Sequence, residues 1–105
     1  LVAEHKKRFN APPDVGQVFA FDAAVAIVEA IKKAGGTDSE KLIAAFGGMT
    51  FEGVTGPLTI KKENHQALRD FYGVTFKEEP GVDWAVPVLY RKFSGPELDK
   101  LAGGK

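Results

Sequence analysis

One stretch of the sequence limits the possible folds more than any other, the apolar run "VFAFDAAVAIVEAI" at residues 18–31. Its spacing predicts a helix from about Gln17 to Ala34, ended by the pair Gly35 and Gly36. The polar residues of this helix form one narrow stripe, made of Asp22, Glu29, Lys32 and Lys33. A helix this apolar needs cover on most of its surface, as when it lies between a sheet and neighbouring helices. Two acidic interruptions leave the run short of the roughly 20 residues of a membrane-spanning helix.

Composition narrows the classes of function. The chain has 105 residues, of which 44% are hydrophobic and 27% charged, values that are typical of one soluble globular domain. Lys plus Arg equals Asp plus Glu at 14 each, so no net charge attracts nucleic acid. The chain has no cysteine, which removes disulfides, thiolate metal sites and cysteine nucleophiles. We therefore expect no nucleic-acid partner.

Two further helices flank the apolar one. Helical spacing predicts a helix over residues 1–9 that ends at "NAPPDVG", and because no capping residue precedes it we expect its beginning to lie upstream. "TDSE" at 37–40 fits a capping box in which Thr37 and Glu40 bond to each other's backbone N–H groups. The helix that follows is expected from about Asp38 to Phe46, with a buried face of Leu42, Ile43 and Phe46.

From residue 49 the apolar period changes from that of a helix to that of a strand. "MTFEGVTG", "PLTIKK" and "LRDFYGVTF" read as three strands, and Leu58 and Ile60 alternate with polar neighbours. "WAVPVLYRKF" at 84–93 reads as a last strand, apolar enough to be buried on both faces, with Pro87 near a sheet edge or at the strand's start. The polar tail at 94–105 is expected to fray. The fold class is therefore α/β.

The residues able to carry chemistry are few. His5 lies on an apolar helix face and is interpreted as a packing residue, whereas His65, beside Asn64 in "KKENHQAL", is interpreted as part of a turn. Neither histidine has a second ligand at a metal-binding spacing. Four isolated carboxylates are interpreted as part of a solvent-exposed face. Four aromatic residues are interpreted as part of the core, in preference to the lining of a ligand pocket. The carboxylates are Asp22, Glu29, Glu40 and Glu52, and the aromatics are Phe19, Phe21, Trp84 and Tyr90.

Read in order, the motifs resemble the C-terminal portion of the type I periplasmic binding proteins, the branched-chain amino acid ABC transporter substrate-binding family. The resemblance rests on two stretches of the sequence. The first is "KKRFNAPPDVGQVFAFDAA", and the second is "AIVEAIKKAGGTDSEKLIAAFGGMTFEGVTGPLTIKKENHQAL". The likeness runs from residue 1 to about 77. Phe21 and Phe46 depart from the family's usual residues, and the first of these substitutions affects a possible pocket wall.

The resemblance implies a fold of two α/β lobes that close around a small ligand. It implies that residues 1–72 belong to one lobe, that 73–82 cross the hinge and that 83–105 form the last strand and tail of the other lobe. It places Gln17, Val18 and Phe19 near the ligand, and a helix start offers free N–H groups to an anion. It implies a periplasmic or extracytoplasmic location, and as partners an ABC permease and the upstream part of the same protein.

The leading hypothesis is a non-enzymatic solute-binding component of an ABC transporter, which captures an amino acid or a related small carboxylate by hinge closure. It predicts no catalytic residue, no metal and no cofactor. A free-standing, non-catalytic α/β interaction module is the alternative. A hydrolase that uses Ser94 and His65 is the least favoured hypothesis, since nothing in the sequence places these residues together.

Overall fold

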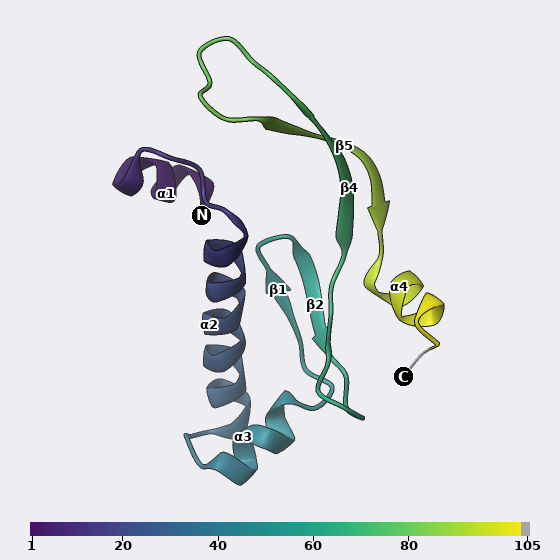
Figure 1. Ribbon diagram of the computed structural model, residues 1–105. Helices are drawn as coiled ribbons and strands as arrows, with labels where there is room; N and C mark the ends of the chain where they lie inside the picture. The colour runs from purple at the N-terminus through teal and green to yellow at the C-terminus, as the bar shows by residue number, and fades with distance from the viewer. Residues whose placement is uncertain (104–105) are drawn as a thin grey trace. The chain divides into compact units, whose positions relative to one another are not determined.

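The computed structural model describes residues 1–103, and the chain divides into two compact units, Leu1–Ala67 and Leu68–Lys105 (Figure 1). The first unit contains three helices and a small sheet, and the second contains a two-stranded sheet and a short helix. The fold is therefore mixed α/β, as predicted. The assignment of residues 1–72, 73–82 and 83–105 to two lobes and a hinge stays a prediction.

The first unit begins with three helices: α1 (Val2–Phe9), α2 (Val15–Ala34) and α3 (Ser39–Phe46). Helix α2 starts two residues earlier than predicted, because Asp14 caps it and forms a capping box with Gln17. It ends, as predicted, at Gly35, whose φ of 73° lies in the left-handed region that glycine tolerates.

The cap of helix α3 differs from the prediction by one residue. The side chain of Asp38, and not that of Thr37, accepts the first-turn N–H, with 3.2 Å between Oδ2 and the nitrogen of Lys41. On this helix Ala45 is buried, whereas Ile43 is 55% exposed, so the prediction that Ile43 is buried is wrong for the described chain. Leu42 and Phe46 pack partly against the core, as expected.

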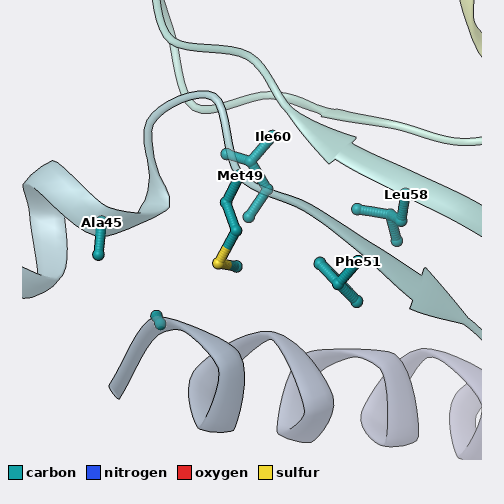
Figure 2. Packing of buried hydrophobic residues seen from close by; sticks show 6 residues of the cluster. Ala45, Met49, Phe51, Leu58 and Ile60 are labelled. Atoms are coloured by element: carbon teal, nitrogen blue, oxygen red, sulfur yellow. The ribbon is translucent and has the colours of Figure 1, made fainter. Parts of the chain in front are cut away.

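A three-stranded sheet in the order β1-β2-β3 follows, with β1 (Thr50–Gly53), β2 (Gly56–Ile60) and β3 (Ala67–Leu68), and Ala67 of β3 is the last residue of the first unit. Strands β1 and β2 form an antiparallel hairpin that runs beside α2 (Figure 1). Figure 2 shows the core between the hairpin and the helices, a cluster of Ala30, Ala45, Met49, Phe51, Leu58 and Ile60. The predicted alternation that buries Leu58 and Ile60 is confirmed.

The second unit pairs β4 (Phe71–Lys77) with β5 (Val86–Phe93) in an antiparallel ribbon. A bulge at Gly73/Val74 leaves Tyr90 between the partners of these two residues, and the Tyr90 ring lies over Gly73. Most of β5 is exposed, so the prediction of a strand buried on both faces does not hold for the described chain. Pro87 is the second residue of β5, close to the strand's start, as predicted.

The chain after β5 is helical, and the prediction of a fraying tail is wrong for residues 95–101. Helix α4 (Gly95–Leu101) begins after Ser94, whose Oγ accepts the N–H of Glu97 at 3.3 Å. Asp70 fastens this helix to the base of the ribbon, because its carboxylate accepts the N–H of Gly95 at 3.0 Å and binds Lys92 at 3.1 Å. These contacts lower the pKa of Asp70, and the Gly95 hydrogen bond is the main cause. Gly104 and Lys105 lie outside the described residues.

Candidate functional site

The start of α2 is the part of the chain that the sequence singled out for a ligand. It follows the two prolines of "NAPPDVG" and is organised by Asp14. The Asp14 carboxylate accepts the N–H of Val15 at 2.7 Å, and the backbone N–H of Asp14 donates to Oε1 of Gln17 at 3.0 Å. The first turn of the helix is therefore fixed by its own side chains.

The three residues predicted to lie near a ligand differ in how they are used. Gln17 is exposed, but its side-chain oxygen is engaged in the capping box. Val18 is half-buried, and its N–H donates to the carbonyl oxygen of Asp14 at 3.2 Å. Phe19 is 49% exposed, so a large aromatic surface is open at the end of the first turn. Their contact with a ligand stays a prediction.

The expectation that this helix start offers free N–H groups to an anion needs correction. The carboxylate of Asp14 already accepts from the first turn, at Val15 and at the third helical position. It also brings a negative charge to the positive end of the helix dipole. What the helix start offers is mainly the apolar and aromatic surface of Val15 and Phe19, which are 58% and 49% exposed.

Asp22, one turn after Phe19, is buried, and the interpretation of this carboxylate as part of a solvated face is wrong. Only 3% of its surface is exposed, and Oδ1 accepts the N–H of Val54 at 2.8 Å. The missing side chain of Gly53 makes room for it, since a Cβ atom there would lie 2.9 Å from Oδ1. The sequence marks Asp22 only as an acidic residue with apolar neighbours on both sides, and it does not indicate the partner, Val54.

The histidines and Ser94 have structural roles. Nδ1 of His5 lies 2.8 Å from the carbonyl oxygen of Ala11, and its ring packs on Phe9 with 4.7 Å between centroids. His65 occupies the predicted turn with φ of 56°, and its N–H donates to Lys61 O at 2.9 Å. Ser94 caps α4, as described above. Among residues 1–103, no three His, Cys, Asp or Glu side chains are grouped so that they could hold a metal ion.

The loop that joins β4 to β5 encloses an open cavity of about 320 Å³. Trp84, a candidate pocket residue from the sequence, is among the side chains around it, and it is 40% exposed. One of the acidic residues of the cavity, Glu79, already pairs with Lys77 at 2.7 Å. The lining residues are Glu78, Glu79, Val82, Asp83, Trp84 and Ala85.

Comparison with protein families decides which family this arrangement belongs to. A family model described as "Periplasmic binding protein" matches residues 1–80, which include all of the first unit and all of β4. The chain belongs to the periplasmic binding protein family. Proteins of this family are extracytoplasmic solute-binding components of ABC transporters and are generally not enzymes. The resemblance inferred from the sequence motifs is thereby confirmed.

Three solved structures, all from Rhodopseudomonas palustris, are similar to the chain. An ABC-type branched-chain amino acid transporter protein from strain CGA009 is 48% identical, with a TM-score of 0.85 over 92% of this chain and 26% of its own. An ABC transporter protein is 52% identical, with a TM-score of 0.64 over 73% of this chain and 23% of its own. A solute-binding protein from strain BisB5, solved with 3,4-dihydroxybenzoic acid, is 32% identical, with a TM-score of 0.78 over 90% and 26%.

The chain thus spans about a quarter of the length of these related structures, which agrees with the expected portion of a two-lobe periplasmic binding protein. A comparison with curated proteins gives no match. Within residues 1–103, none of the helices has the length and apolar character needed to cross a membrane.

Proposed function

We propose that the chain forms part of the solute-binding component of an ABC transporter and that this component captures a small carboxylate between two lobes. The observation that carries the proposal is the family match over residues 1–80. The component would work outside the cytoplasm and deliver its ligand to a membrane permease. Capture would require no catalytic group and no cofactor.

The names of the similar structures support a carboxylate as the ligand class. One of these proteins is described as a branched-chain amino acid transporter, and another was solved with 3,4-dihydroxybenzoic acid. Both kinds of molecule combine a carboxylate with an apolar or aromatic body. The exposed ring of Phe19 suits that body, because aromatic side chains provide a large contact area together with a defined geometry.

In this proposal Gln17, Val18 and Phe19 face the ligand, and Phe19 contributes most of the binding energy from this segment. The carboxylate is held by groups outside the 105 residues, since Asp14 already occupies the first turn of α2. Hot spots of binding are commonly aromatic side chains in desolvated positions. Phe19 becomes such a position only when the second lobe closes over it.

The exposed apolar face of α2 supports the proposal that upstream parts of the same protein cover this helix. Phe21, Ile27 and Val28 are 46%, 53% and 49% exposed. Leaving such side chains in water forfeits about 1.5 to 3 kcal/mol each. Because the related structures are about four times longer than the matched segment, they have enough additional chain to cover this face.

Closure must be coupled to binding for such a protein to signal its loaded state. A shift from 1:99 to 99:1 in favour of the closed form requires the ligand to bind that form about 5.5 kcal/mol more tightly. Contacts made by Phe19 only after closure would contribute to this difference.

The test uses the full-length protein that contains this chain. Isothermal titration calorimetry with leucine, isoleucine, valine and 3,4-dihydroxybenzoate should identify a ligand, and small-angle scattering should show compaction when it binds. Phe19→Ala should then weaken binding at least tenfold with little change in thermal stability, because Phe19 is half-exposed in the 105-residue chain and lies outside its buried core.

Ile27→Ala is the matched control, because Ile27 lies on the same helix two turns further from its start, away from the segment proposed to face the ligand. It should leave the affinity unchanged. Unchanged affinity in Phe19→Ala would remove this residue from the site. Binding without compaction would contradict capture by closure.

A further inference from the structure

We infer that Asp22 is a positioning residue that fixes the first two turns of α2 to the turn of the β1–β2 hairpin. The significance of this role for ligand binding rests on the proposed function, because Val18 and Phe19 lie in the segment that Asp22 holds. The inference about positioning itself concerns the described residues alone and can be tested without a ligand.

The first step is that burial of the Asp22 carboxylate is energetically unfavourable at this position. It is 3% exposed and is surrounded in sequence by the apolar residues of "VFAFDAAVA". Burial of a carboxylate is unfavourable unless hydrogen bonds compensate for the lost water. The hydrogen bond from Val54, 2.8 Å long, provides such compensation and directs Oδ1 of Asp22 at the hairpin turn.

The second step is that this turn receives an acceptor from outside the hairpin. Gly53 pairs with Gly56, which leaves Val54 and Thr55 as a two-residue turn. Neither of these β-branched residues has a positive φ, and the positive φ of the turn, 118°, falls on Gly56. The turn therefore presents the N–H of Val54 to the Asp22 carboxylate without a strained backbone at Val54.

The third step is that the hairpin is shaped to receive the carboxylate. A Cβ atom at Gly53 would lie 2.9 Å from Oδ1, 3.2 Å from Cγ and 3.3 Å from Oδ2 of Asp22. All three distances are shorter than ordinary van der Waals contacts. A Cβ atom at position 53 would therefore force the Asp22 carboxylate or the hairpin to shift.

The fourth step is that the apolar core packs against the part of α2 that follows Asp22. The buried Ala30 lies eight residues after Asp22, about 12 Å further along the axis, and packs in the cluster with Ala45 and Met49 (Figure 2). The partly buried Val25, Ala26 and Ala34 also follow Asp22 in the sequence. The start of α2, including Phe19, is thus positioned mainly through Asp22.

The decisive experiment measures amide hydrogen exchange at residues 18–21 in the full-length protein without ligand. Asp22→Ala leaves the N–H of Val54 without its acceptor and should speed exchange at residues 18–21 about tenfold or more. Asp22→Asn keeps an oxygen acceptor of the same shape and should restore most of the protection. Met49→Ala, which weakens the core at the far half of α2, is the matched destabilised control.

A merely structural role for Asp22 predicts that Asp22→Ala and Met49→Ala raise exchange in the same pattern. The positioning role predicts that Asp22→Ala acts chiefly at residues 18–21 and at the hairpin turn. Wild-type protection at residues 18–21 in Asp22→Ala would overturn the inference.

Ligand affinity separates this inference from the proposed function. If Phe19→Ala weakens binding of the probe identified by calorimetry, Asp22→Ala should weaken it as well, and Met49→Ala should do so much less. If Phe19→Ala has no effect while Asp22→Ala still frees residues 18–21, the ligand site is wrong and the positioning role stands. Equal losses of affinity in Asp22→Ala and Met49→Ala would contradict a role of Asp22 beyond stability.

Discussion

The two units of the chain differ in the kind of interaction that stabilises each of them internally. All the buried apolar residues of the described chain lie in the first unit, between α2, α3 and the β1–β2 hairpin. Among residues 68–103, the described part of the second unit, Gly95 alone is buried. The ribbon of the second unit leaves Phe76, Leu89 and Tyr90 more than half exposed.

Polar contacts take the place of a core in the second unit. Asp70 binds both Lys92 and the N–H of Gly95, Arg91 pairs with Glu97 at 3.2 Å, and the Arg91 guanidinium lies 4.4 Å from the centre of the Phe93 ring. A two-stranded ribbon is marginally stable by itself in water. The comparison teaches that substitutions in the apolar core should destabilise the first unit. The second unit should be destabilised by substitutions that disturb its backbone contacts or its charged side chains.

Removal of a core ring should give the largest effect. Phe51 is 8% exposed, and Phe51→Ala should lower the free energy of unfolding of the 105-residue chain by about 3 to 5 kcal/mol, through lost burial and a cavity. Leu89→Ala, at a residue that is 56% exposed in the ribbon, should change it by less than about 0.5 kcal/mol. Urea unfolding followed by circular dichroism measures both. An equal loss in Leu89→Ala would contradict a ribbon that is stabilised without a buried apolar core.

A pair of glycines should sharpen the contrast within the first unit. Gly53→Ala forces a Cβ atom against the Asp22 carboxylate and should cost about 1 to 3 kcal/mol. Gly16→Ala is the matched control, because no atom lies within 4 Å of the added Cβ and the position is helical. It should stabilise the chain by about 0.5 to 1 kcal/mol. Thermal unfolding compares the two, and a neutral Gly53→Ala would contradict the tight approach of Asp22.

The ribbon has its own close contact at a glycine. A Cβ atom on Gly73 would lie 2.6 Å from Cζ of Tyr90, but Tyr90 is 68% exposed and its ring can swing into solvent. We therefore expect Gly73→Ala to cost about 1 kcal/mol, and Tyr90→Ala in the same chain to relieve most of this. A double-mutant cycle measures the coupling. Additive effects of the two substitutions would show that the ring does not restrict position 73.

Local signals in the sequence predicted the elements of the first unit well. The spacing of apolar residues and the terminal glycines defined α2 and α3 to within two residues, because helix periodicity and caps act over a few neighbouring positions. The alternation at Leu58 and Ile60 likewise defined β2. The helix α4 was missed although Ser94 and Glu97 have the spacing of a capping box, because the tail was interpreted from its polarity alone.

The roles of single side chains could not be read in the same way. Asp22 was grouped with Glu29 and two lysines as a polar stripe, yet its partner, Val54, lies 32 residues away in the sequence. No local pattern contains that contact. Ile43 was assigned to the core from helical spacing, yet it is 55% exposed, since spacing alone does not determine which side chains of a short helix meet the core. The proposed ligand contacts of Gln17, Val18 and Phe19 stay a prediction.

The last prediction concerns acid, and it tests the polar cluster that takes the place of a core in the second unit. The N–H of Gly95 and the ammonium of Lys92 lower the pKa of Asp70 in the folded state. In the unfolded chain the pKa of Asp70 has its ordinary value of about 4. The unfolded state therefore binds the proton first as the pH falls. The stability contributed by ionised Asp70 is fully present above about pH 4, and it is lost as the pH falls toward the lowered folded pKa.

Nuclear magnetic resonance can follow this titration through the Gly95 amide, whose hydrogen bond to Asp70 should weaken as the carboxylate is protonated. Lys92→Met should move the midpoint upward, but only in part, because the Gly95 hydrogen bond is the larger cause of the lowered pKa. Asp70→Asn should remove the titration while keeping an oxygen acceptor for Gly95. A titration midpoint of Asp70 at or above the ordinary value would mean that this carboxylate does not bind α4 to the ribbon. The explanation that charged contacts stabilise the second unit would then be wrong.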